Sequence, residues 1–268
     1  MSFLSKVLRL KRTPVTVEEL KAALKNKEFS FHYQPEWDLK TNRVVAVEAL
    51  ARWQSPKRGY VPPMQFIPLM EESGLIHDFT SILFGQALAD LAQLHQIQPD
   101  LSMAVNLSVC QLQEPKLIDT IQKNLMENNI DVKYLECELT ESQELTEDIL
   151  NDAIFKRLIQ LGVAISLDDF GMGESSFARL KQLNVQKLKI DLYFIRELLK
   201  DKKNQAIVSS IIQLGHDLGF PVLAEGIETK TQQIWLKEHG CDYGQGYWFS
   251  RALPMDQLKI FLQEKVEK

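Results

Sequence analysis

Short apolar runs alternate with longer amphipathic stretches along most of the chain. The amphipathic periodicity predicts helices over residues 16–27, 77–96, 115–129, 147–160, 192–214, 229–238 and 254–265. Between the later helices lie six short runs rich in apolar and β-branched residues, namely "LSMAVNLS", "YLECELTE", "VAISLDD", "QKLKID", "PVLAEGIE" and "CDYGQGYWF". Strands separated by helices are typical of a parallel sheet with right-handed crossovers.

The beginning of the chain follows a different pattern. Thr16 is suited to cap the first helix, with Glu19 three residues later, and two strand-like runs follow, "FSFHYQPEWDL" and "RVVAVEALARW". Only "KTN" separates these runs, which predicts a hairpin-like start. Roughly eight strands without a Gly-rich dinucleotide fingerprint favour closure into a barrel over an open doubly wound sheet. We therefore expect one α/β domain over residues 16–268, preceded by an appendage or linker over residues 1–15.

Composition excludes several classes of protein. The chain has 268 residues and a formal charge of −5, so a bulk electrostatic grip on nucleic acid is not expected. No apolar run approaches the roughly 20 residues that span a bilayer. Three cysteines without CxxC spacing indicate a reducing compartment, and we expect a cytoplasmic protein. The basic start "MSFLSKVLRLKR" is compatible with a linker helix, a frayed terminus or a segment peripheral to the inner face of the membrane.

Polar residues of particular kinds lie in or directly after the apolar runs. In a parallel barrel the carboxyl ends of the strands meet at one face, where barrel enzymes carry their chemistry. Residues from distant parts of the sequence would therefore converge there. The residues in question are Glu48, Asn106, Glu138, Asp168, Asp169, Lys189, Glu225 and Gln245.

The predicted cluster has an excess of negative charge. Its five carboxylates and the ammonium of Lys189 carry a formal charge of −4. Carboxylates about 4 Å apart repel one another by roughly 4 kcal/mol at an effective dielectric of 20. Two divalent cations would bring the formal charge to zero. Carboxylate oxygens and the amide of Asn106 are ligands for hard ions, so Mg²⁺ or Mn²⁺ is expected rather than zinc.

Seven motifs occur in a specific order between Val47 and Pro254: "VEALARW", "VNLS", "ELTES", "DDFG", "KLKID", "AEGIET" and "GQGYWFSRALP". With them the chain resembles, from about Val17 to Leu262, the EAL family of cyclic di-GMP phosphodiesterases. The resemblance implies a modified (β/α)8 TIM-type barrel with an antiparallel first strand. It also implies two-metal hydrolysis of cyclic di-GMP, a bacterial second messenger, to linear pGpG. A homodimer is expected, with regulation by an upstream sensory domain or a partner protein.

The resemblance also implies roles for individual residues. Glu48, Asn106, Glu138 and Asp168 match the ligands of one metal, and Asp168, Asp169 and Glu225 match those of the second. Lys189 matches the lysine that holds the attacking water, and Gln245 supports the same water network. Glu141 matches a residue that braces the loop after "DDFG". The substrate-binding set comprises Gln34, Arg52, Glu228 and Asp191, the last two as acids behind the direct contacts.

One question about this chemistry stays open in the sequence. Glu48 and Glu225 belong to the catalytic set, but spacing does not decide whether Glu225 also acts as a general base. Mg²⁺ or Mn²⁺ is the expected cofactor, and Ca²⁺ is expected to bind without supporting catalysis.

The chain departs from the family pattern at several positions. In Met172, Gly173 and Glu174, which follow "DDFG", the methionine and the glutamate replace the usual threonine and aromatic residue, which puts the turnover rate in doubt. Glu36 stands where an apolar residue is usual, and Leu192 and Tyr193 replace a frequent Arg-Ser pair. An alternative is therefore a catalytically weak receptor that binds cyclic di-GMP and signals through a protein partner. A protein-interaction module without nucleotide is a third hypothesis, against which the retained ligands argue.

Overall fold

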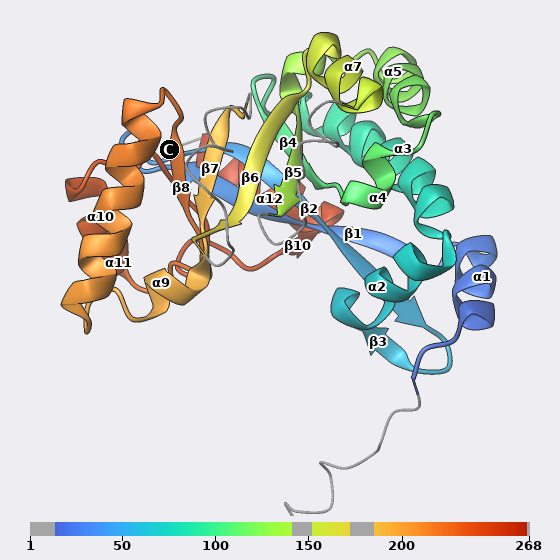
Figure 1. Cartoon of the computed structure of the whole chain (residues 1–268), viewed down its shortest axis with the longest axis horizontal. Helices are drawn as coiled ribbons and strands as arrows, with labels where there is room; N and C mark the ends of the chain where they lie inside the picture. Colours follow the sequence, from blue (N-terminus) through green and yellow to red (C-terminus); the bar gives the residue numbers. More distant parts are fainter. Residues whose placement is uncertain (1–13, 141–151, 172–184, 267–268) are drawn as a thin grey trace, which may run out of the picture. The chain divides into compact units, whose positions relative to one another are not determined.

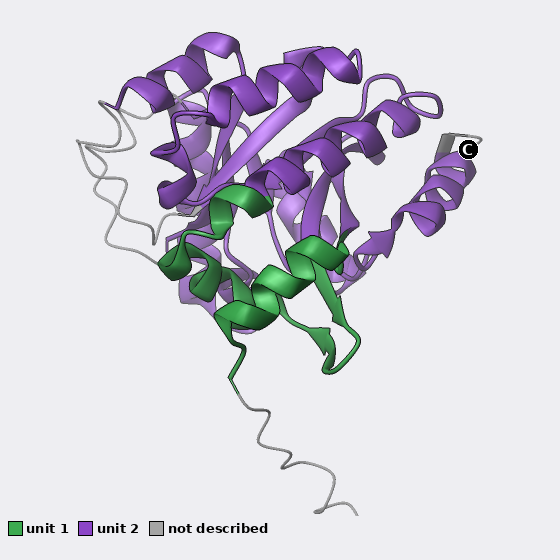
Figure 2. Ribbon diagram, turned by 90° about the vertical axis from the view of Figure 1, so that its right-hand side faces the viewer, with its two compact units in different colours: residues 1–30, 52–79 green, residues 31–51, 80–268 purple. Residues whose placement is uncertain are grey.

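A computed structural model describes residues 14–140, 152–171 and 185–266. The chain divides into two compact units, coloured separately in Figure 2. Unit 1 comprises residues 1–30 and 52–79, and unit 2 comprises residues 31–51 and 80–268. The single domain expected over residues 16–268 stays a prediction, and the appendage falls largely outside the described residues.

A closed ring of strands, most of them labelled in Figure 1, lies largely in unit 2. Neighbouring strands follow the order β1-β9-β8-β7-β6-β5-β4-β2, and β2 pairs back with β1. Their bounds are β1 Phe29–Asp38, β2 Arg43–Ser55, β4 Ser102–Asn106, β5 Leu135–Thr140, β6 Ala164–Phe170, β7 Lys187–Ile190, β8 Val222–Ala224 and β9 Tyr243–Gly244. The strands from β2 through β4 to β9 pair in parallel, whereas β1 is antiparallel to β9. The predicted barrel with an antiparallel first strand is thereby confirmed.

Helices alternate with these strands along the chain, as the periodicity predicted. They are α3 Ile76–Leu94, which begins in unit 1, α4 Val109–Leu112, α5 Leu117–Glu127, the 3₁₀ turn η2 Val132–Tyr134, α7 Ala153–Leu161, α9 Leu192–Arg196, α10 Lys202–Asp217, α11 Lys230–Glu238 and α12 Met255–Val266. A short strand β10, Leu253–Pro254, pairs with β1. Among the helices of the described residues, none is both long and apolar enough to cross a membrane.

Two predicted elements differ in the structure. The helix expected over 192–214 is two helices, because Asp201 accepts a hydrogen bond from the backbone of Lys203 and so caps a second start. The strand expected in "CDYGQGYWF" is reduced to Tyr243–Gly244. Beyond it Gly246 has a φ of +154°, and a Cβ there would lie 2.2 Å from the carbonyl oxygen of Ile227. This close approach between two backbones ends the strand and allows only glycine.

Unit 1 is held by an aromatic core and capped helix ends. Helix α1, Val17–Asn26, begins with the predicted capping box between Thr16 and Glu19. Strand β3, Gly59–Val61, pairs with the end of β2, and α2 covers Pro63–Ser73. The rings of Phe29 and Trp53 lie 5.6 Å apart. Helix α2 was absent from the prediction, because its prolines at the start and in the middle are typical of a helix break.

Strand β7 shows how the barrel sorts its side chains. All four of its residues are buried. Leu188 packs towards α10, within reach of a Cβ placed on Gly215, whereas Lys187 and Lys189 contact acidic side chains of other strands. Successive residues of a strand point to opposite faces, so the two lysines share the barrel interior at consecutive levels. The interior of this barrel is therefore ionic near the ends of its strands.

Candidate metal centre and pocket

The strand ends of unit 2 carry the polar residues that the sequence singled out. Cα pairing places Asn106 beside Glu138 across β4 and β5. Glu225 and Gln245 directly follow β8 and β9. The other residues at this level are Glu48 on β2, Asp168 and Asp169 on β6, and Lys189 on β7. The barrel thus gathers side chains that are far apart in sequence.

Lys189 lies at the centre of four carboxylates. Its Nζ is 2.7 Å from Glu138 Oε1 and 2.8 Å from Glu225 Oε1. Asp168 Oδ1 lies at 3.5 Å and Glu48 Oε2 at 3.8 Å. The lysine is fully buried, and burial alone would lower its pKa, but the surrounding carboxylates raise that pKa well above its usual value. Lys189 is therefore a permanent cation.

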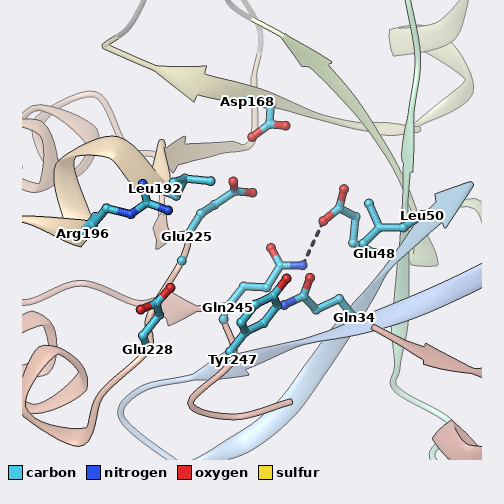
Figure 3. A pocket seen from close by; sticks show the side chains of 12 residues that line it. Gln34, Glu48, Leu50, Asp168, Leu192, Arg196, Glu225, Glu228, Gln245 and Tyr247 are labelled. Atoms are coloured by element: carbon cyan, nitrogen blue, oxygen red, sulfur yellow. Dashed lines mark hydrogen bonds between the residues drawn. The ribbon is translucent and has the colours of Figure 1, made fainter. Parts of the chain in front are cut away.

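Glu48 is the carboxylate best supplied with hydrogen bonds. Asn106 Nδ2 donates to Oε1 at 2.7 Å, and Gln245 Nε2 donates to Oε2 at 2.9 Å, as Figure 3 shows for the glutamine. Burial raises the pKa of Glu48, but the charge of Lys189 and these two hydrogen bonds outweigh it, so the pKa is lowered. Glu48 is thus held ionised in one orientation, and Oδ1 of Asn106 is left to bind a cation.

Three other carboxyl groups are short of positive charge. Burial, together with repulsion from Glu48, raises the pKa of Glu138 well above its usual value. Burial raises the pKa of Glu225 to about 8 despite the charge of Lys189. Burial and the neighbouring Asp168 raise the pKa of Asp169 to about 7. One ammonium is therefore too little charge to keep the whole cluster ionised at neutral pH.

Backbone geometry explains how two consecutive aspartates serve one site. Residues of a regular strand alternate between faces, but the pairing of β6 with β7 shifts register between Leu167 and Phe170. Asp169 adopts a φ of +55°, in the left-handed region that few side chains tolerate. One oxygen each from Asp168, Asp169 and Glu225 consequently lies within 4.8 Å of the others.

The donor set fits a hard divalent cation. Its side-chain ligands are oxygens, which suit Mg²⁺, Mn²⁺ and Ca²⁺. Both oxygens of Glu138 are buried and accept no hydrogen bond of ordinary geometry, although Lys189 is close to one of them. Such atoms are costly unless a cation satisfies them.

A pocket of about 320 Å³ opens above this cluster (Figure 3). The site residues predicted from sequence that line it are Gln34, Glu48, Asp168, Glu225, Glu228 and Gln245. Gln34 donates from Nε2 to the carbonyl oxygen of Ser250. Asp191 is absent from this lining and caps α9, accepting from Tyr193 N at 2.6 Å.

The predicted substrate-binding residue Arg52 is also absent from this lining. Arg52 belongs to unit 1, near the end of β2. Glu141 lies outside the described residues, as does the altered segment that begins at Met172.

Sequence reasoning missed several residues of the lining. Leu50, Leu192, Arg196 and Tyr247 also line the pocket. Leu192 and Arg196 are four residues apart on α9 and so share one helix face, a spacing that could have indicated them. Tyr247 carries the guanidinium of Arg251 over its ring, 4.0 Å from the centroid, and no pattern in the sequence indicates this contact.

Fold and site first define a class, a modified (β/α)8 barrel with a buried cluster of oxygen ligands at its strand ends. A sequence model described as the EAL domain matches residues 17–252. The chain therefore belongs to the EAL domain family.

Known proteins resemble the chain over most of its length. It is 38% identical over 248 residues to the signaling protein YkoW of Bacillus subtilis, covering 92% of this chain and 31% of that protein. It is 37% identical over 243 residues to the bifunctional diguanylate cyclase/cyclic di-GMP phosphodiesterase MucR of Pseudomonas aeruginosa, covering 90% and 36%. The structure of the PaMucR phosphodiesterase in complex with c-di-GMP matches with a TM-score of 0.84 and 37% identity, covering 90% of this chain and 98% of that one. The chain spans about a third of the length of these two curated relatives.

Proposed function

We propose that the chain hydrolyses cyclic di-GMP to linear pGpG with the help of two bound divalent cations, Mg²⁺ or Mn²⁺. One observation carries the proposal: four carboxylates from separate strands surround Lys189 at the base of a pocket. The names of the relatives, which include cyclic di-GMP phosphodiesterases, support the choice of substrate.

The residues present would divide between two cations. Glu48, Asn106, Glu138 and Asp168 would hold one, and Asp168, Asp169 and Glu225 would hold the other. When bound, such a pair of cations neutralises the phosphodiester, activates water and stabilises the leaving oxygen. Ca²⁺ would occupy the same ligands without supporting hydrolysis.

The chain's own residues would then orient the reaction. Lys189 has its Nζ within 3 Å of both Glu138 and Glu225, so it can hold the attacking water by donating a hydrogen bond beside those ligands. Gln245 would keep Glu48 in place through the bond at 2.9 Å. Glu225 would act as an ionised ligand of the second cation, because its raised pKa of about 8 applies to the site without cations.

Product analysis tests this proposal. The purified chain is incubated with cyclic di-GMP and Mn²⁺ or Mg²⁺, and the products are separated by chromatography. We expect pGpG from the native chain, no product with EDTA and no product from Glu48→Ala. Glu127→Ala is the matched control, because Glu127 lies on the exposed face of α5 and should leave the rate unchanged.

Product analysis together with calorimetry decides between hydrolysis and a receptor function. Calorimetric binding of cyclic di-GMP without any pGpG would contradict hydrolysis and favour the receptor. The altered segment after "DDFG" is the feature that motivates this alternative, and the double variant Met172→Thr/Glu174→Tyr would then be examined for restored turnover.

The proposal includes a homodimer and control by a partner or an upstream sensory domain. Both rest on the resemblance to the family. Sedimentation velocity at micromolar concentration should give the mass of two chains, and a fully active monomer would contradict the dimer.

A further inference from the structure

A second group of buried charges lies deeper in the barrel than the candidate metal centre. Lys187 Nζ is 2.7 Å from Glu36 Oε2 and 2.8 Å from Glu136 Oε1. The side chains of Lys187, Glu36 and Glu136 are 7%, 1% and 12% exposed. They come from β7, β1 and β5, so the contacts join three strands. We call these three residues the lower ionic layer, and the carboxylates around Lys189 the upper ionic layer.

The two layers are stacked by the period of the strands. Lys187 and Lys189 are two residues apart on β7, and Glu136 and Glu138 are two residues apart on β5. Alternate residues of a strand share one face and are separated by about 6–7 Å along it. Ser166 of β6 pairs with both Glu138 and Lys187, and its buried hydroxyl makes no hydrogen bond. The two layers therefore lie one above the other in the protein interior, about 6–7 Å apart along the strands.

The lower ionic layer carries a net negative charge. One ammonium and two carboxylates give a formal charge of −1, and Oε1 of Glu36 is buried without a hydrogen bond. Apolar side chains of similar volume are often as stabilising as a buried ion pair, so packing alone does not require this arrangement. The excess charge is supplied by a glutamate at position 36, where the sequence had already departed from its family pattern.

Charges in the two layers influence each other through the interior. Burial raises the pKa of Glu36, and the charges of Lys187 and, more weakly, Lys189 oppose that rise. Screening by water is weak at buried positions, so a charge added or removed below is felt above.

We propose that the lower ionic layer sets the affinity of the upper ionic layer for divalent cations, and that Glu36 is the residue that tunes it. The negative charge of this layer attracts cations into the site and balances Lys189, which would otherwise repel them. The inference relies on the proposed function only in taking the upper ionic layer as the cation site. Glu36 acts through the field and through Lys187, and it touches neither cation nor substrate.

Replacing charge and shape separately tests this role. Glu36→Gln keeps the shape and removes the charge, whereas Glu36→Asp keeps the charge and changes the shape. Binding of Mn²⁺ to the full chain is measured by titration calorimetry after treatment with EDTA and dialysis. We expect Glu36→Gln to bind Mn²⁺ about tenfold more weakly and Glu36→Asp to stay within about twofold of the native affinity.

Two further variants distinguish a loss of charge from a general loss of folding. Glu136→Gln removes the other negative charge of the layer and should weaken Mn²⁺ binding in the same direction. Glu19→Gln is the matched control, because Glu19 pairs with Arg58 in unit 1 and should leave the affinity unchanged. Thermal unfolding in EDTA establishes that each variant is folded before titration.

The outcomes separate this inference from the proposed hydrolysis. Native affinity in Glu36→Gln, or equal weakening in Glu36→Gln and Glu36→Asp, would overturn the role of the charge. The readout is Mn²⁺ affinity, so a native chain that binds Mn²⁺ without forming pGpG contradicts the proposed hydrolysis alone.

Discussion

The two ionic layers of the barrel differ in how fully their charges are balanced. In the lower ionic layer one lysine meets two carboxylates at 2.7 and 2.8 Å in a nearly sealed position. In the upper ionic layer one lysine meets four carboxylates, and several of the lining groups face a pocket. The lower ionic layer has one negative charge in excess and is nearly closed to solvent, so it can act on cations only from a distance. The upper ionic layer has a larger excess beside a pocket, so it can bind cations directly.

The largest expected effect is a difference in reaction rate between variants of the two lysines, one in each layer. At saturating Mn²⁺, Lys189→Met should lower the rate of pGpG formation about a thousandfold, because a group that orients the attacking water is lost. Lys187→Met should stay within about tenfold of the native rate, because its ammonium is one level below the reacting atoms. Initial rates measure both. Equal losses in the two variants would show that the layers do not differ in function.

Cation binding should stabilise only the protein whose upper ionic layer is intact. At free Mn²⁺ about 100 times its dissociation constant, each site adds about 2.7 kcal/mol to the free energy of unfolding. Thermal unfolding with Mn²⁺ and with EDTA measures this gain. Glu48→Ala should lose most of the gain and Glu127→Ala should keep it. Stabilisation of Glu48→Ala equal to that of the native chain would place the cation elsewhere.

The free energy of unfolding should fall as the pH rises, whereas carboxylates with lowered pKa values make it rise. The pKa of Glu225 in the folded chain is raised to about 8, and that of Asp169 to about 7. The folded state then binds more protons than the unfolded state between about pH 4.5 and 8, so stability falls as the pH rises through this range. Glu48, whose pKa is lowered, contributes only at more acidic pH.

Melting temperatures from pH 5 to 8.5 in EDTA test this sign. They should decrease with pH, whereas Mn²⁺ should remove the decrease, because the bound carboxylates are then ionised. A melting temperature in EDTA that rises across this range would contradict the assignment.

The smallest expected effect concerns the wall of the pocket. Arg196 is the one residue with a fixed positive charge among the described residues that line it. Arg196→Ala should raise KM for cyclic di-GMP about tenfold, equivalent to about 1.4 kcal/mol, with little change in kcat. Arg157→Ala is the control, since that guanidinium lies on the exposed surface of α7. A loss confined to kcat would instead assign Arg196 to the chemical step.

Much of the site could be predicted because its residues lie at strand ends. Glu138 and Lys189 lie within apolar runs and Glu225 follows one, and parallel strands carry the carboxyl ends of such runs to one face. Arg196 and Tyr247 were missed because each belongs to a segment after its strand, and only the four-residue spacing of Leu192 and Arg196 on α9 could have indicated the arginine. The helix over 192–214 was wrong because the cap at Asp201 competes locally with a continuous amphipathic pattern.

By itself the sequence determined the alternation of strands and helices, the hairpin-like start and the acidic residues near the strand ends, because periodicity and turn chemistry act over short distances. Only the tertiary structure decided that Glu36 meets Lys187 across the barrel and that Asp169 turns back towards Glu225. Contacts across a closed barrel depend on the stagger and tilt of all its strands together. A local sequence pattern indicates the charged residues, and the closed sheet determines which of them lie in the same layer.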